Sequence, residues 1–137
     1  LFIDTKQNPD FWNAAPNQYF FPNWDEYVRY HDNYEMISRM REGYVIIKKG
    51  KDGLRDRWYD INIPALARHV RCVNGAGDTV IAAYTAEYLR GGDPRRCLQM
   101  ASCAAALAVE ASLTAAPTYE ATLALWKEEY ASTQMGG

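Results

Sequence analysis

The chain has 137 residues, of which 48% are hydrophobic and 23% charged, so it is long enough to bury a core and too apolar to stay disordered. Its formal net charge of −2 provides no basic field for nucleic acid or for an anionic membrane surface, and we expect neither partner. Three cysteines without a CxxC pair, and two histidines, do not suggest a zinc site. We expect reduced thiols in a cytoplasmic protein.

The first residues form an apolar run that predicts a short strand over residues 1–3. We expect no signal peptide, because charge follows at Asp4, and no membrane span, because the longest apolar run covers only residues 104–109. The first residue is leucine rather than methionine, and we expect the true start of the protein to lie upstream.

The segment up to residue 63 alternates between strand and helix signals. Residues 18–21 predict a second strand, which Pro22 ends. Residues 23–41 carry apolar side chains at helical spacing and predict one or two helices, with a break near residues 32–33. Residues 44–47 are continuously apolar and β-branched, as in a central strand. A glycine turn and an antiparallel pair over residues 54–63 follow.

Three helices are predicted in the rest of the chain. The first follows the turn at residues 75–77 and ends at Gly91-Gly92. The second begins at Asp93-Pro94, an N-cap followed by proline, and the third near Thr118. The residues expected to share one face within each helix are Val80, Ile81, Tyr84 and Tyr88; Leu98, Ala101, Ala105 and Ala108; and Tyr119, Leu123, Trp126 and Tyr130.

Strands that alternate with helices predict an α/β fold with a mostly parallel sheet flanked by helices. We expect a single domain over residues 1–133 and a flexible tail over residues 134–137.

The sharpest chemical feature is the segment Asn74-Gly75-Ala76-Gly77-Asp78-Thr79 at the start of a predicted helix. A helix N-terminus presents unpaired N–H groups and a positive dipole end, and glycines let a ligand approach the backbone. The turn can therefore form an anion hole for phosphate oxygens. Asp78 at its mouth can accept a proton from an attacking hydroxyl.

Other interpretations of this turn remain open. A plain tight turn with Asp78 as a helix cap fits the spacing equally well. A dinucleotide fingerprint fits less well, because Val80 occupies its third glycine position. A Walker A loop is absent, since residues 50–53 lack its spacing and its Lys-Ser/Thr ending.

Residues 73–83, Val-Asn-Gly-Ala-Gly-Asp-Thr-Val-Ile-Ala-Ala, resemble the second signature of the PfkB family of carbohydrate kinases, commonly written D-T-x-G-A-G-D. The resemblance implies that Gly75, Ala76 and Gly77, with Asn74 beside them, form the anion hole. It implies that Asp78 is the base that activates the sugar hydroxyl. The glycine-ended helix and the alanine-rich helix after it also match the family, which implies an adenine pocket lined by Ser102, Ala105 and Val109.

Two segments further upstream are similar to other elements of the family. Pro22-Asn23-Trp24-Asp25-Glu26 is similar to its P-N-x-x-E element, which implies that Asn23 and Glu26 organise Mg²⁺ through water. Without the resemblance, Glu26 is interpreted as a solvated carboxylate at a helix start. Residues 48–53 are similar to the K-x-G-x-x-G turn, which implies that Lys48, Gly50 and Gly53 contact the nucleotide. A lysine-rich surface hairpin is the equal alternative.

The resemblance implies the C-terminal portion of a three-layer ribokinase-like fold. It also implies ATP- and Mg²⁺-dependent phosphorylation of a sugar or sugar-phosphate hydroxyl, with a homodimer as one candidate assembly. Residues 4–6 and 77–83 are most similar to the heptose-phosphate kinase branch. The alternatives are a truncated, non-catalytic nucleotide-binding or oligomerisation module, and a vitamin or nucleoside kinase of the superfamily.

The chain also departs from the family pattern. Cys72 stands where the signature usually has aspartate, and residues 112–114 lack a common glycine. The first half of a typical member, which supplies most sugar contacts, has no counterpart in this sequence.

Overall fold

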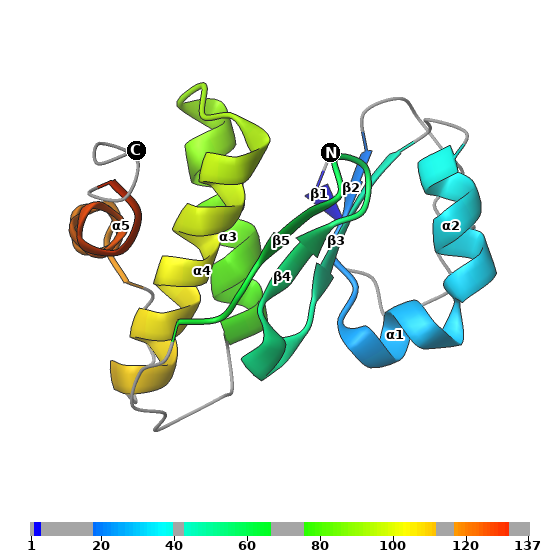
Figure 1. Ribbon diagram of the computed structural model, residues 1–137, viewed down its shortest axis with the longest axis horizontal. Helices are drawn as coiled ribbons and strands as arrows, with labels where there is room; N and C mark the ends of the chain where they lie inside the picture. The colour runs from blue at the N-terminus through cyan, green and yellow to red at the C-terminus, as the bar shows by residue number, and fades with distance from the viewer. Residues whose placement is uncertain (1, 4–17, 40–42, 67–75, 112–116, 132–137) are drawn as a thin grey trace. The chain divides into compact units, whose positions relative to one another are not determined.

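A computed structural model describes residues 2–3, 18–39, 43–66, 76–111 and 117–131 (Figure 1). The chain divides into two compact units, Leu1–Pro64 and Ala65–Gly137, which we call the first and the second unit. Each has its own elements and is described by itself. Residues 134–137, the predicted tail, lie outside the described residues.

The first unit is built on a mixed sheet with the strand order β1-β2-β3-β4-β5. Its strands are β1 Phe2–Ile3, β2 Gln18–Phe20, β3 Gly43–Lys48, β4 Leu54–Asp56 and β5 Ile61–Ile63. The pairs β1–β2 and β2–β3 are parallel, whereas β3–β4 and β4–β5 are antiparallel. The parallel part and the antiparallel pair over residues 54–63 both occur as the sequence predicted.

Two short helices, α1 Trp24–Arg29 and α2 His31–Arg39, contact β3. Their apolar side chains form one core with alternate residues of the strands: Phe20, Tyr27, Tyr34, Ile37, Val45 and Ile47. The helix break falls at Tyr30 rather than at residues 32–33. The backbone of Tyr30 leaves the helical conformation, with φ of −114° and ψ of 35°. Its N–H still donates to the carbonyl oxygen of Glu26 at 3.0 Å, and α2 begins at the next residue.

The second unit contains α3 Ala76–Leu89, α4 Pro94–Ala111, α5 Tyr119–Trp126 and a π-helical turn, η3 Lys127–Ala131. The predicted cap at Asp93 is confirmed, and the helix start predicted near Thr118 is capped as well. Asp93 Oδ1 accepts a hydrogen bond from the N–H of Arg96 at 2.8 Å, directly before Pro94. Thr118 Oγ1 accepts one from the N–H of Ala121 at 3.1 Å. These caps satisfy backbone donors that a helix start leaves unpaired.

The predicted aromatic face of α5 is confirmed, because Trp126 is buried against Met100 and Cys103, and Tyr119, Leu123 and Tyr130 pack against the same cluster. The prediction for α3 was wrong at one position. Val80 and Tyr84 are buried, but Tyr88 is 43% exposed and Glu87 is buried in its place.

The burial of Glu87 has an electrostatic cause. Its Oε1 lies 2.7 Å from Arg96 Nε of α4, and its Oε2 accepts a hydrogen bond from the Tyr119 hydroxyl of α5 at 3.2 Å. A buried carboxylate is tolerated when it is paired in this way. The inner face of α3 therefore ends in an ion pair rather than in the apolar residue that helical spacing predicts.

Candidate functional site

Two segments that the sequence singled out meet at the carboxyl ends of neighbouring parallel strands in the first unit. Asn23, which follows β2, forms a parallel bridge with Lys48, the last residue of β3. The N–H of Lys48 donates to the carbonyl oxygen of Pro22 at 2.8 Å. Ligands of α/β sheets bind outside the carboxyl ends of their strands. The fold thus brings Asn23 and Lys48 together at the edge where a ligand is expected.

Asn23 and Glu26 form a capping box at the start of α1. Asn23 Oδ1 accepts from the N–H of Glu26 at 2.8 Å, and Glu26 Oε1 accepts from the N–H of Asn23 at 2.9 Å. This is the helix-start role that sequence alone indicated for Glu26. Because a carboxylate has two oxygens, the cap occupies Oε1 and leaves Oε2 for a further contact.

A tight glycine turn follows β3. Its 3₁₀ segment, Gly50–Asp52, lies between Lys49 and Gly53, and the N–H of Lys49 donates to the carbonyl oxygen of Gly53 at 2.8 Å. Gly50 and Gly53 have φ of +56° and +94°, conformations that side chains disfavour. A Cβ placed on Gly50 would meet no atom within 4 Å, so the outer side of the turn is open at this residue.

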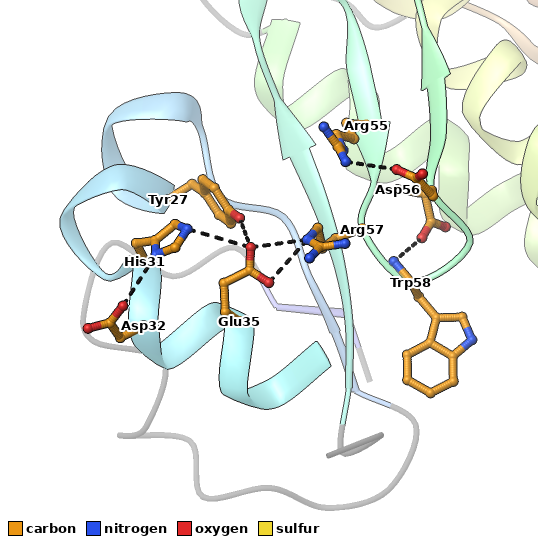
Figure 2. A network of polar contacts seen from close by, with 9 residues as sticks. Tyr27, His31, Asp32, Glu35, Arg55, Asp56, Arg57 and Trp58 are labelled. Carbon is orange, nitrogen blue, oxygen red and sulfur yellow. Dashed lines mark hydrogen bonds and ion pairs between the residues drawn. The ribbon is translucent and has the colours of Figure 1, made fainter. Parts of the chain in front are cut away.

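A polar network connects α1, which begins with the Asn23–Glu26 capping box, to α2 and to the turn after β4 (Figure 2). Glu35 of α2 accepts a hydrogen bond from the Tyr27 hydroxyl of α1. Arg57 Nε, in the turn after β4, lies 3.1 Å from both Glu35 oxygens. His31 Nε2 lies 3.5 Å from Glu35 Oε1. One carboxylate therefore connects α1, α2 and the end of β4.

Tyr27, Glu35 and Arg57 hold fixed charge states near neutral pH. Burial raises the pKa of Tyr27 to about 12, and the hydrogen bond to Glu35 adds to the rise. Burial alone would raise the pKa of Glu35, but the hydrogen bonds from Arg57 and Tyr27 outweigh it and lower that pKa below 4.5. The hydrogen bond to Glu35 raises the pKa of Arg57. A neutral phenol and a permanent ion pair indicate an anchor rather than an acid–base centre.

In the second unit, α3 begins at Ala76, so Ala76, Gly77 and Asp78 form its first turn. The sequence placed the first two of these in the preceding turn. The first N–H groups of a helix have no partner within it, which suits an anion. Asn74, Gly75 and the side chain of Asp78 lie outside the described residues, so their assigned roles stay predictions.

The predicted adenine-side residues lie on α4. Ser102 is buried and Ala105 is half-buried, while the side chain of Val109 lies outside the described part of the chain. Met100 and Ala104 are on the opposite face of the helix, at its 3.6-residue period. That opposite face borders a cavity of about 220 Å³, lined by Thr79, Ala82, Ala83, Ala86, Met100, Ala104, Pro117, Tyr119 and Thr122. The cavity is therefore separate from the predicted adenine face.

Two contacts near the strand ends were missed in the sequence. Lys49 Nζ lies 5.9 Å from the centroid of the Trp24 ring, and Glu35 pairs with Arg57. Tyr27, His31 and Glu35 follow one another at four-residue spacing, which was the one local signal for the network. Nothing local pointed to Arg57.

Within the described ranges, no three His, Cys, Asp or Glu side chains gather as a metal site, and no helix has the length and apolarity to cross a bilayer.

The model of the pfkB family carbohydrate kinases matches residues 32–121. The chain belongs to this family. The resemblance first seen at residues 73–83 is thereby confirmed.

Among curated proteins, this PfkB-family chain is 40% identical over 77 residues to the bifunctional protein HldE of Coxiella burnetii. The alignment covers 54% of this chain and 16% of that protein. Relatives of this name agree with the heptose-phosphate kinase branch that the sequence indicated. The chain spans only a small part of their length.

Solved structures show the ribokinase-like α/β fold that the sequence predicted. The Burkholderia thailandensis nucleoside kinase in complex with inosine matches with a TM-score of 0.71 and 24% identity, over 82% of this chain and 41% of that one. The Arabidopsis thaliana ribokinase complexed with ribose and ATP matches with a TM-score of 0.64 and 24% identity, over 80% and 40%. At this identity the likeness concerns the fold alone.

Proposed function

We propose that the protein transfers the γ-phosphoryl group of ATP to a hydroxyl of a sugar or sugar phosphate, with heptose-type sugar phosphates as the preferred acceptor class. The observation that supports this most is the PfkB-family match over residues 32–121, which includes the Asn74–Asp78 segment. The meeting of Asn23 and Lys48 at the strand ends adds support from the first unit.

In the proposed mechanism Asp78 accepts the proton of the acceptor hydroxyl. The hydroxyl oxygen forms its bond to the γ-phosphorus while the bond from that phosphorus to the bridging oxygen breaks, and ADP leaves. The backbone N–H groups of Gly75, Ala76 and Gly77 stabilise the charge on the transferring group. Lys48, with the turn at Gly50 and Gly53, binds phosphate. Ser102, Ala105 and Val109 form the adenine side.

Mg²⁺ fits the first unit in one respect: Glu26 keeps a carboxylate oxygen that the helix cap does not use. Asn23 and Glu26 would hold the ion through water, as hard cations prefer oxygen ligands and Mg²⁺ retains much of its hydration. The bound ion would supply neutralisation of phosphate charge.

The test compares the wild type with Asp78→Asn. Release of ADP is followed with a panel of sugars, sugar phosphates and inosine, and ATP binding is measured in parallel. We expect Asp78→Asn to lose about 10²–10⁴-fold in turnover while it still binds ATP. Asp93→Asn is the matched control, because asparagine also caps helices well and Asp93 serves as the cap of α4.

A second candidate function is a nucleotide-binding or oligomerisation module that does not turn over by itself. It is the alternative that the sequence leaves open beside the kinase. ATP binding without ADP release from either wild type or Asp78→Asn supports this candidate. Phosphorylation of inosine in preference to the sugars supports the nucleoside-kinase alternative.

The remaining expectations are part of the same proposal. We expect residues 1–133 to fold as one domain and the protein to be cytoplasmic, with a homodimer as one assembly. A single cooperative unfolding transition and a sedimentation measurement of mass test the first and the last of these.

A further inference from the structure

Lys49 carries a cation that has no acidic partner in the part of the chain that the structure describes. Its ammonium lies 5.9 Å from the centroid of the Trp24 ring, within the roughly 6 Å range of a cation–π interaction. Its backbone is fixed on both sides of the glycine turn, because its N–H donates to Gly53 and its carbonyl accepts from Asp52 at 3.0 Å. The base of this side chain is therefore held, and its charge is available.

Trp24 is held in turn by the residues beneath it. It is the first residue of α1, directly after Asn23, and it is 50% exposed. Its ring packs at 5.8 Å against the ring of Tyr27, which is buried and bonded to Glu35. One side of the indole thus rests on a fixed element of the core. The interaction with Lys49 then directs the ammonium to the edge where β2 and β3 end.

We propose that Lys49 is a second phosphate-binding cation of the nucleotide site and that Trp24 is the residue that positions it. The proposal rests on the proposed function. Lysine binds phosphate as a compact point charge with three donors, and a lysine already oriented on a ring loses less side-chain freedom on binding. The turn beside Lys49 is open at Gly50, where an added Cβ would meet no atom within 4 Å.

The contact also joins the start of α1 to the glycine turn after β3. Trp24 belongs to the segment assigned to the metal, and Lys49 to the turn assigned to the nucleotide. This corner of the first unit is therefore pre-organised for the polyphosphate part of a nucleotide rather than for its base.

The experiment measures binding of ATP, ADP and AMP by calorimetry, first in EDTA and then with Mg²⁺. The variants are Lys49→Gln, Lys49→Arg, Trp24→Leu and the double variant, with Lys127→Gln as control because Lys127 is an exposed lysine of the second unit. We expect Lys49→Gln to weaken ATP binding about tenfold, as for loss of one charge-assisted hydrogen bond, and AMP binding less than about threefold. Lys49→Arg keeps the positive charge and should retain more of the ATP binding than Lys49→Gln does.

Trp24→Leu should weaken ATP binding by about two- to fivefold, and this loss should vanish when residue 49 is already glutamine. A merely structural tryptophan would instead weaken ATP and AMP equally and in both backgrounds, which contradicts the positioning role. ATP binding by Lys49→Gln at wild-type strength overturns the inference and leaves the proposed function standing. If the wild type binds neither ATP nor ADP, the proposed function fails and the inference with it.

Discussion

Arg57 Nε lies 3.1 Å from both carboxylate oxygens of Glu35, and the N–H of Arg57 donates to the carbonyl oxygen of Val45 at 2.9 Å. The pair therefore ties α2 to the central strand β3. Tyr27 donates to the same carboxylate from α1. Since Asn23 and Glu26 lie at the start of α1, the position of this candidate metal element depends on a carboxylate of the next helix, α2.

Glu35→Gln is expected to destabilise the first unit by about 2 kcal/mol, because the amide cannot replace a charged acceptor of three hydrogen bonds. Glu35 is only 13% exposed, so water cannot fully compensate. Urea unfolding followed by far-UV circular dichroism measures the change. Glu128→Gln, on an exposed carboxylate of the second unit, is the control and should change stability by less than about 0.5 kcal/mol.

The same carboxylate predicts a pH dependence. The pKa of Glu35 is lower in the folded protein than its ordinary 4.5, so its contribution to stability is present above that value and is lost as the pH falls through the folded pKa. The wild type should therefore lose stability below about pH 4.5 more steeply than Glu35→Gln. Parallel acid profiles of the two proteins would contradict the assignment of the ion pair.

The turn after β3 predicts a contrast between two glycines. Gly53 has φ of +94° and ψ of −147°, a region that only glycine occupies readily, whereas Gly50 has φ of +56° in open space. We expect Gly53→Ala to cost about 2–3 kcal/mol and Gly50→Ala about 1 kcal/mol in unfolding free energy. Gly50→Asn should be milder still, since asparagine tolerates this conformation. Equal losses at the two positions would mean that the turn adopts a different geometry.

Much of the fold was predictable because its signals are local. Residues 44–47 are apolar throughout, and the structure buries Val45, Ile46 and Ile47 in β3. The cap at Asp93 was predictable because a capping side chain acts on backbone groups only three residues away, and the helix start near Thr118 was predicted as well.

The errors and omissions have a common physical origin in contacts between distant residues. Tyr88 was grouped with Val80 and Tyr84 on one face because helical spacing cannot anticipate that Glu87 meets Tyr119, 32 residues further along the chain. Arg57 was missed because its partner Glu35 is 22 residues away. The sequence did not distinguish the role of Lys49 from that of Lys48. The Trp24 ring that orients the Lys49 ammonium follows β2, whereas both lysines lie at the end of β3.

Gly92 and Gly91 provide a second matched pair of variants. A Cβ on Gly92 would lie 2.7 Å from Glu87 Cγ, whose side chain is fixed by Arg96 and Tyr119, whereas a Cβ on Gly91 meets nothing within 4 Å. We expect Gly92→Ala to destabilise the second unit by about 2–3 kcal/mol through overpacking and displacement of the ion pair. Gly91→Ala, at φ of +87°, should cost about 1 kcal/mol. Thermal unfolding of the two variants measures both losses of stability. A loss at Gly92→Ala no larger than that at Gly91→Ala would show that Glu87 can move aside.

Cys97 is expected to be unreactive in the folded protein. It is 1% exposed, and burial, followed by the charges of Glu87 and Asp93, raises the pKa of its thiol to about 12. At pH 8 the thiolate fraction is on the order of 10⁻⁴, and the thiolate is the nucleophile. Iodoacetamide should therefore modify Cys97 at least about 100-fold more slowly in native protein than in guanidinium, as measured by peptide mass spectrometry. Gly92→Ala should raise the native rate, because the Cys97 thiol donates to the Gly92 carbonyl and both sit beside Glu87. Rapid native labelling of the wild type would show that α4 opens without unfolding of the unit.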